Sequence, residues 1–387
     1  MSKKSGKRYV PISTSKKSPF YKAGNVLLEI DRLILGVVFT FSGFVKVIDP
    51  LGSTYKIQDY MNAFGGFFPN LLFLALPAAI LLSTFELALG LCFLLKIKTK
   101  TTSILAFIFI LCMLPLTLYI ALKNPVTDCG CFGDALILSN WQTFYKNIVL
   151  LFLILMLLVF HKRIRNIFQP TMEWISILIF IALGVGLSIY SLRHEPMIDF
   201  RPYKVGVNIP EAMKIPAGKP VDKFDTKLIY QKNGIKQEFT LENYPKNDST
   251  WTFVEQKTTL IEKGYEPPIH NFNIVDANGN DITESILHEP KVYLLIIYDV
   301  SKASESGAEE AQKIYENAIK NKVLFFALTA STDEDVAQFV KKTGATYPFC
   351  KTDPITLKTI IRSNPGIIFI ENGVITRKWG WRDFSKI

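Results

Sequence analysis

Five long apolar stretches in the first half of the chain constrain its fold more than any other feature. They comprise residues 33–48, 71–95, 102–122, 144–160 and 174–192. Each is about long enough to cross the hydrocarbon core of a bilayer as a helix, at a rise of about 1.5 Å per residue. Runs such as IVLLFLILMLLVF lack the polar face expected of a helix in a soluble protein. We therefore expect five membrane spans, with the lipid bilayer as their partner.

The placement of basic residues predicts the orientation of these spans. The net charge is +10, and lysine and arginine gather before the first span, after the second and after the fourth. Cytoplasmic loops carry such an excess, so these three segments are expected to be cytoplasmic. The basic residues follow the topology instead of forming one patch, so we expect no nucleic-acid partner. The predicted localisation is the inner (plasma) membrane, with a cytoplasmic N-terminus and a periplasmic C-terminal domain.

The run DCGCFGD, residues 128–134, lies between the third and fourth spans on the predicted outer face. Disulfides persist in that compartment, so Cys129 and Cys131 are compatible with a redox pair. Two cysteines separated by one residue form a strained disulfide, which is the labile and oxidising kind. Gly130 and Gly133 supply the backbone freedom that such a bend needs.

Three interpretations of this motif stay open. Carboxylates disfavour thiolates, so the flanking Asp128 and Asp134 count against a redox pair unless a cation offsets them. A structural disulfide or a simple turn is the second interpretation. A metal clip is the third, but tetrahedral zinc takes four ligands and no histidine lies near the pair in sequence. We therefore expect no metal site.

Two ionisable residues of the spans are further candidates. Lys46 lies within a turn of the outer end of the first span, where it either anchors the helix in the headgroups or adds positive charge near the thiols. Glu86 lies well inside the second span, where a carboxyl group is costly unless it is paired, protonated or facing a polar cavity. Counted from Pro77 at the helical rise, Glu86 is ~14 Å below the outer surface. This depth predicts no easy bond to Lys46 and makes Asp31 and Arg32 alternative neighbours. A proton relay, a hydrogen bond to a quinone headgroup and a bond to a neighbouring helix are all open roles for Glu86.

Residues 27–165 resemble the DoxX-like membrane superfamily, most closely its MauE (methylamine utilisation) branch. The resemblance is carried by RLILGVVFTFSGFVKVIDPLGSTYKIQDYMNAFG, by a glutamate in the second span and by DCGCFGD. It implies a four-helix membrane bundle with a redox-associated role, either in forming disulfides in a periplasmic enzyme subunit or in quinone-coupled oxidation. The matching positions are Ser42, Gly43, Lys46, Asp49, Pro50, Glu86, Cys129 and Cys131. The fifth span, at 172–193, and the long tail depart from the family pattern, so methylamine metabolism does not follow.

The remainder of the chain predicts a separate α/β domain. Residues 194–226 have the proline, glycine and charge of a linker, and Asn233-Gly234 predicts a hairpin within 227–241. A second possible hairpin lies at 276–280. From residue 292 onward, strands and helices alternate before a final strand pair at 366–371 and 374–379. A capping box of Ser331 with Glu334 is expected to open one helix, and Asp353-Pro354 another.

This order resembles a thioredoxin-like domain over residues 227–387. Pro365 stands where that fold carries its cis-proline, but Ser301 and Ser304 stand where a Cys-x-x-Cys motif would begin. Without thiols the domain cannot exchange disulfides, so the expected role is to bind a client. Cys350, its one cysteine, is expected on a strand.

The sequence thus predicts a basic leader at 1–26, the four-helix membrane domain with one extra helix, the linker and the thioredoxin-like extracytoplasmic domain. Two functions stay open. One is a component of a membrane thiol-disulfide oxidoreductase, possible through Cys129 and Cys131, with Lys46 tuning the thiols, Glu86 handling protons and a membrane quinone as cofactor. The other is a non-enzymatic envelope scaffold in which the loop, including Asp134, is structural.

Overall fold

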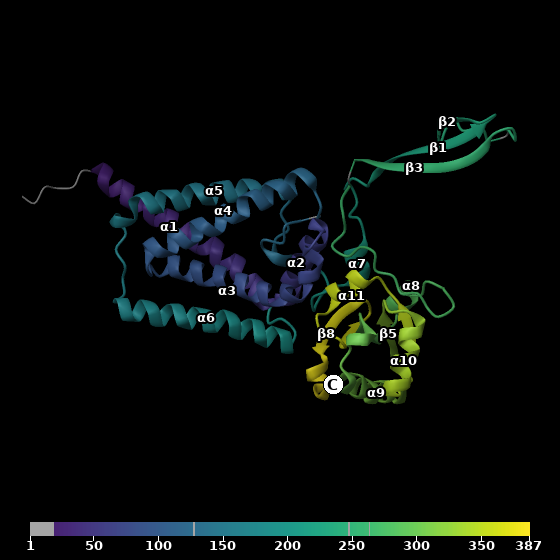
Figure 1. The fold of residues 1–387 in the computed structure, drawn as a ribbon. Coiled ribbons are helices and arrows are strands. Elements are labelled where there is room, and N and C mark those ends of the chain that lie inside the picture. The colour runs from purple at the N-terminus through teal and green to yellow at the C-terminus, as the bar shows by residue number, and fades with distance from the viewer. Residues whose placement is uncertain (1–18, 127, 247, 263) are drawn as a thin grey trace, which may run out of the picture. The chain divides into compact units, whose positions relative to one another are not determined.

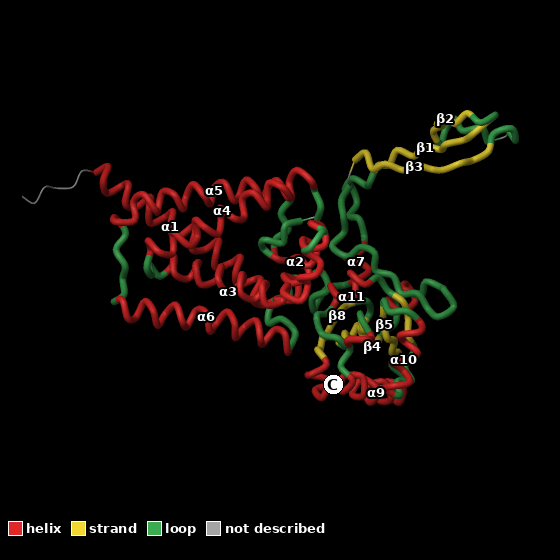
Figure 2. Tube along the Cα trace, viewed as in Figure 1, coloured by secondary structure: helices red, strands yellow, loops and turns green. Residues whose placement is uncertain are grey.

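The computed structural model describes residues 19–126, 128–246, 248–262 and 264–387, and the chain divides into two compact units (Figures 1 and 2). The units are Met1–Phe200 and Arg201–Ile387. Most of the basic leader predicted at 1–26 lies outside the described residues.

Long helices make up the first unit, and the five expected spans correspond to α1, α3, α4, α5 and α6. Within the part of the chain that the structure describes, four helical segments are long and apolar enough to cross a membrane. The fifth candidate is α1 together with α2, which are bent by 96° with respect to each other. In Figure 1, α6 runs along one side of the other spans, next to α3. The helices of this unit are α1 (Pro19–Ile48), α2 (Pro50–Phe64), α3 (Ala75–Leu94), α4 (Thr99–Lys123), α5 (Asn140–Phe160) and α6 (Pro170–Arg193).

The bend between α1 and α2 has a local cause in the sequence. Proline lacks a backbone N–H, so Pro50 is tolerated at the first position of a helix but not in its interior. The Asp49 carboxylate accepts a hydrogen bond from the Gly52 N–H at 3.0 Å and thereby caps α2. The first expected span, residues 33–48, ends where α1 ends, and a second helix follows it immediately.

Glycine allows α1 and α3 to approach closely. A Cβ at Gly43 would lie 2.3 Å from the Leu87 backbone nitrogen, and one at Gly90 would lie 2.2 Å from the Thr40 nitrogen. Without a solvent-driven hydrophobic effect between helices in lipid, such close packing is a main source of helix association. Phe39, Phe93 and neighbouring aliphatic side chains form the hydrophobic core between the helices.

Two sheets form the second unit. A three-stranded antiparallel sheet has the order β2-β1-β3, and Asn233 and Gly234 make its hairpin turn with positive φ angles of 50° and 80°. The predicted hairpin is confirmed. Strand β3 was not predicted, and it extends the hairpin through an antiparallel pairing with β1. The bounds are β1 (Lys223–Lys232), β2 (Ile235–Thr240) and β3 (Thr252–Glu262).

The second sheet has five strands in the order β6-β5-β4-β7-β8. Strands β4, β5 and β6 are parallel, and β7 and β8 are antiparallel to their neighbours. This is the thioredoxin-like α/β arrangement that the order of elements predicted, and the Asn364–Pro365 peptide bond is cis. The remaining elements are α7 (Ile209–Met213), α8 (Thr283–Leu287), β4 (Lys291–Ile297), α9 (Glu305–Lys320), β5 (Leu324–Thr329), α10 (Asp333–Thr343), β6 (Phe349–Lys351), α11 (Pro354–Ile360), β7 (Gly366–Glu371) and β8 (Val374–Gly380).

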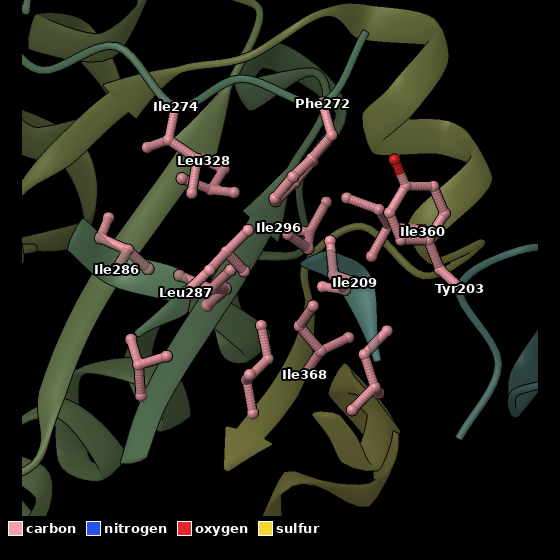
Figure 3. Packing of buried hydrophobic residues seen from close by; sticks show 14 of the residues in the cluster. Tyr203, Ile209, Phe272, Ile274, Ile286, Leu287, Ile296, Leu328, Ile360 and Ile368 are labelled. Carbon is pink, nitrogen blue, oxygen red and sulfur yellow. The ribbon is translucent and has the colours of Figure 1, made fainter. Parts of the chain in front are cut away.

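Apolar side chains from the central strands pack into the core shown in Figure 3. Ile296 on β4 and Ile368 on β7 lie at its centre and are fully buried. Tyr203 and Ile209 join the same core, although they lie within the range expected to be a linker. The Ile209 N–H also donates to the Gly373 carbonyl at 2.9 Å. Part of that range is therefore built into the domain.

The predicted cap of α10 is wrong by one residue. Thr332, not Ser331, precedes the helix and accepts a hydrogen bond from the Asp335 N–H. Ser331 Oγ instead accepts a hydrogen bond from the Val300 N–H at 3.1 Å. The Ser331 hydroxyl, which the local pattern assigned to the start of α10, thus makes a tertiary hydrogen bond. The expected cap at Asp353 is confirmed, because its carboxylate accepts from the Thr356 N–H at 2.7 Å.

Candidate functional site

The Cys-Gly-Cys loop joins α4 to α5. Cys129 and Cys131 are both thiols and both half-buried, and their Sγ atoms lie 3.1 Å apart. Gly130 and Gly133 have positive φ angles of 67° and 51°, a region that favours glycine over residues with a Cβ. The expected need for glycine at both positions is confirmed. The local backbone therefore holds the two sulfur atoms within contact distance of each other.

Hydrogen bonds from two helices fix the backbone of this loop. Ser42 Oγ on α1 donates to the Cys131 carbonyl oxygen at 2.8 Å. The Tyr60 hydroxyl on α2 donates to the Cys129 carbonyl oxygen at 2.6 Å. Because α2 follows α1 after a sharp bend, two consecutive helices both contact the loop.

Asp128, which begins the motif, is paired. Its carboxylate lies 2.6 Å from Lys56 Nζ on α2 and also accepts from the Gly130 N–H at 2.9 Å. The lysine therefore offsets part of the negative charge that we expected to disfavour a thiolate. Asp134, at the other end of the motif, lies in a short 3-10 turn, Gly133–Ala135.

Lys46 and Glu86 form an ion pair, which contradicts the expectation that Glu86 lies too deep. Lys46 Nζ is 2.8 Å from both carboxylate oxygens of Glu86. The side chains are 14% and 8% exposed. Helical side chains lean toward the helix N-terminus, and Lys46 does so, since its Nζ also donates to Ser42 Oγ at 3.1 Å. This direction takes the ammonium into the bundle and not to the headgroups.

Asp31 and Arg32, the alternative neighbours of Glu86, lie elsewhere in the bundle. Arg32 donates to the carbonyl oxygens of Phe93 and Leu94 at the end of α3, and its Nε lies 3.0 Å from the Glu29 carboxylate. The arginine therefore links α1 to the C-terminal end of α3. It takes no part in the environment of Glu86.

Ser42 connects the ion pair to the thiol loop. Its hydroxyl lies 2.6 Å from Glu86 Oε2 and, as described, binds the Cys131 carbonyl. A cavity of about 180 Å³ contains these groups. Its polar lining is Ser42, Lys46, Ser53, Lys56, Tyr60, Ser83, Glu86, Cys129, Cys131, Lys146 and Asn147. Side chains such as Phe109, Ile110 and Leu150 form an apolar wall.

The electrostatic environment shifts the pKa values of the two thiols in opposite directions. A hydrogen bond from Cys129 and the ammonium groups of Lys146 and Lys46 lower the pKa of Cys131 from 9.0 to about 6, although burial opposes them. The same hydrogen bond, together with burial, raises the pKa of Cys129. The arrangement therefore favours one thiolate on Cys131 that is hydrogen-bonded by the Cys129 thiol. A thiolate is the nucleophilic form in disulfide exchange.

Sequence reasoning missed three residues of this site: Lys56, Tyr60 and Lys146. Lys146 lies on the fourth span, where an ionisable residue is a functional candidate by default. That signal was available in the sequence. Lys56 and Tyr60 lie on α2, a helix that could not be oriented before its bend against α1 was known.

In the second unit, the positions expected to replace a Cys-x-x-Cys motif are structural. Ser304 caps α9 by accepting from the Gly307 N–H at 3.3 Å, and Ser301 Oγ donates to Asp299 at 2.6 Å.

Cys350 lies on β6, as expected, and is buried. Burial raises its pKa to about 11, which disfavours the reactive thiolate. Among the described residues, no three His, Cys, Asp or Glu side chains are grouped so that they could hold a metal ion.

Comparison with known structures gave matches of limited extent. One is the solution structure of a "putative protein disulfide isomerase" from Bacteroides thetaiotaomicron, with 20% identity and a TM-score of 0.25, covering 30% of this chain and 80% of that one. Another is the crystal structure of a hypothetical protein, SMc02350, from Sinorhizobium meliloti 1021. It has 17% identity and a TM-score of 0.23, covering 27% of this chain and 64% of that one. No curated protein matches.

Two family models match parts of the sequence. Residues 224–263, which contain the three-stranded sheet, match a domain of unknown function, DUF8463. Residues 24–160 match the family described as methylamine utilisation protein MauE. The matched range contains α1 to α5 almost completely, with every residue of the Lys46–Glu86 pair and the Cys-Gly-Cys loop. This chain is therefore a multi-pass membrane protein whose residues 24–160 match the MauE family, and its C-terminal domain has the five-stranded α/β fold with a cis-proline described above.

Proposed function

We propose that Cys129 and Cys131 cycle between a dithiol and a disulfide, and that this cycle is the function of the membrane domain. The observation that carries the proposal is the 3.1 Å contact between the two Sγ atoms in a cavity that also contains the Lys46–Glu86 pair. A MauE-family domain joined to a thioredoxin-like domain also points to a redox-associated role.

Oxidation of the Cys129 thiol and the Cys131 thiolate forms the Sγ–Sγ bond and releases two electrons and one proton. A lipid quinone takes up the two electrons, that proton and a second proton relayed by Glu86, and becomes a quinol; the reverse transfer reduces the disulfide. Lys46 and Lys146 stabilise the Cys131 thiolate in this scheme. Glu86 accepts or supplies a proton, and Ser42, which contacts both Glu86 and the loop, positions it. The apolar wall of the cavity supports a quinone headgroup as the partner of the thiols.

The proposed orientation places the loop and the C-terminal domain on the extracytoplasmic, periplasmic face of the inner membrane, and the N-terminus in the cytoplasm. The distribution of basic residues supports it. A client protein would then exchange disulfides with the loop. The thioredoxin-like domain, which has serine at 301 and 304, would recruit that client without reacting with it.

A second candidate function is a non-enzymatic envelope scaffold. The observation that favours it is the number of contacts that hold the loop, from Ser42, Lys56 and Tyr60. A loop held in this way would also serve as a fixed turn. In that case the thiols would never change their redox state.

Alkylation trapping in intact cells separates the two candidates. If the pair is redox-active, the fraction of Cys129 and Cys131 that reacts with a maleimide changes when the quinone pool is reduced or an external thiol is added. Cys112, at the middle of the span α4, faces lipid and should stay unlabelled under all conditions, so it provides the negative control. A constant redox state of the pair across all conditions rejects the proposal in favour of the scaffold.

Substitution of one cysteine tests client exchange. In a Cys129→Ala variant, a mixed disulfide through the nucleophilic Cys131 cannot be resolved by its neighbour and should accumulate. A non-reducing gel followed by mass spectrometry detects the adduct, and Cys112→Ala serves as the matched control. If trapping with either cysteine of the pair yields no adduct, the pair does not exchange disulfides with a protein.

A further inference from the structure

A second cavity lies at the end of the bundle opposite the thiol loop. It has a volume of about 520 Å³ and lies between the start of α4 and the connection from α5 to α6. Its charged and titratable lining consists of Lys98, Lys100, His161, Lys162, Arg165 and Glu173. Neither the proposed thiol chemistry nor the resemblance to MauE assigns a role to this cavity.

The charge of this cavity is strongly positive. Glu173 is the one carboxylate in the lining, and it is already engaged. Its Oε1 accepts from the Lys98 N–H at 3.1 Å, and its Oε2 lies 3.7 Å from Lys98 Nζ. Lys100, Lys162 and Arg165 are exposed and add three positive charges. The cavity therefore presents an excess of cations that an anion would neutralise.

The start of α4 adds to this positive potential. The first turn of α4 has no acidic residue, and Asn166 Oδ1 accepts from the Thr99 N–H at 3.4 Å and from the Thr99 hydroxyl at 3.3 Å. The N-terminus of a helix carries a partial positive charge and favours anions, above all phosphate. Thr101 brings a hydroxyl group to the same cavity, which the Asn166 amide also lines. Cations, a hydroxyl group and a helix start together form a setting suited to a phosphate group.

The surface beside the cavity is apolar. Ile167 and Trp174 are 65% and 59% exposed, and Phe168 and Met172 are exposed as well. Lys98 Nζ lies 4.7 Å from the centre of the Trp174 ring. Tryptophan concentrates at the level of lipid headgroups, so the ring marks the depth of the membrane interface. A ligand with one anionic phosphate and adjoining hydrocarbon chains fits both the cavity and its surroundings.

We propose that this cavity binds the phosphate of an anionic phospholipid, with the headgroup among Lys100, Lys162 and Arg165 and the acyl chains against the apolar surface near Trp174. Basic clusters between membrane helices are a known setting for such headgroups. The inference is independent of the thiol chemistry and holds for either orientation in the membrane. A free phosphate ion is the alternative source of the same chemistry.

Native mass spectrometry of the full-length protein in detergent tests the site. The probes are phosphatidylglycerol and phosphatidylcholine with identical acyl chains. Each lysine or arginine near a lipid surface contributes about a fivefold factor to binding. Lys100→Gln should therefore weaken phosphatidylglycerol binding about fivefold, and Lys100→Gln with Arg165→Gln roughly 25-fold, because both side chains are exposed and their loss leaves the fold intact.

Lys123→Gln is the matched control, because Lys123 is an exposed lysine at the opposite end of the same helix. It should leave binding unchanged. Equal retention of phosphatidylcholine, or equal weakening by Lys123→Gln, would overturn the proposal. A third arm adds inorganic phosphate in excess. Displacement of the lipid by phosphate at a comparable concentration would show a free-anion site and overturn the lipid assignment, whereas persistence of the lipid supports it.

Discussion

The Lys46–Glu86 pair makes a quantitative prediction about stability. Two unit charges 2.8 Å apart attract each other by about 6 kcal/mol at an effective dielectric constant of about 20. Desolvation of both groups opposes this attraction, and the loss on removing a single partner of a buried pair is typically about 3–5 kcal/mol. Lys46→Met leaves a buried carboxylate beside Ser42, and Glu86→Gln leaves a buried ammonium. We expect each variant to lose roughly that free energy of unfolding.

The double variant distinguishes a real pair from two independent effects. Lys46→Met with Glu86→Gln leaves no uncompensated charge, so it should lose no more than either single variant. The coupling free energy would then be about 3 kcal/mol or more. Denaturant unfolding in mixed micelles, followed by tryptophan fluorescence, provides the measurement.

The outcome that refutes this reasoning is additivity. If the double loss equals the sum of the single losses within about 0.5 kcal/mol, the two side chains are not coupled. The control cycle uses Lys227 and Glu238, which lie 2.9 Å apart but are 48% and 53% exposed. Water screens such a pair, so its coupling should be undetectable in the same assay.

Three further predictions concern the site and its scaffold. The alkylation rate of Cys131 should be high above a pH of about 6 and fall as the pH drops through that value, because the thiolate is lost; a midpoint near 9 would contradict the described environment. Lys146→Gln should raise that midpoint, since it removes an ammonium, and an unchanged midpoint would assign the shift to other groups. Gly43→Ala should cost about 1–3 kcal/mol of unfolding free energy, because the added Cβ pushes α1 away from α3. Gly186→Ala is the control: its Cβ would have no neighbour within 4 Å, so the variant should be neutral or slightly stabilised. Equal melting temperatures of the two variants would argue against the close contact.

The sequence predicted elements better than it predicted side-chain partners. Uninterrupted apolar runs leave few alternatives to a membrane helix, so all five long helices were expected. The alternation of strands and helices after residue 292 similarly predicted the five-stranded sheet. Strand β3 was not predicted, because its polar residues gave no buried face to recognise, and it lies at the edge of the sheet paired with β1.

The candidate site was predicted in composition but not in connectivity. Cys129, Cys131, Lys46 and Glu86 were each singled out for being costly or reactive where they lie. The contact between Lys46 and Glu86 depends on the direction of the Lys46 side chain and on the close approach of α1 and α3 at Gly43. A depth calculated from the rise per residue includes neither. The same limit hid Lys56 and Tyr60, whose position depends on the angle between two helices.

Because of the bend at Asp49-Pro50, the site depends on how α2 is rotated about its own axis relative to α1. Lys46 and Ser42 precede the bend, and Lys56 and Tyr60 follow it, yet all four line one cavity. One residue inserted between Asp49 and Pro50 would keep every side chain but turn α2 by about 100° about its axis. Lys56 and Tyr60 would then leave the loop together. In this part of the chain a change in spacing is therefore more damaging than most substitutions, and a relative could retain every motif residue and still lose the site.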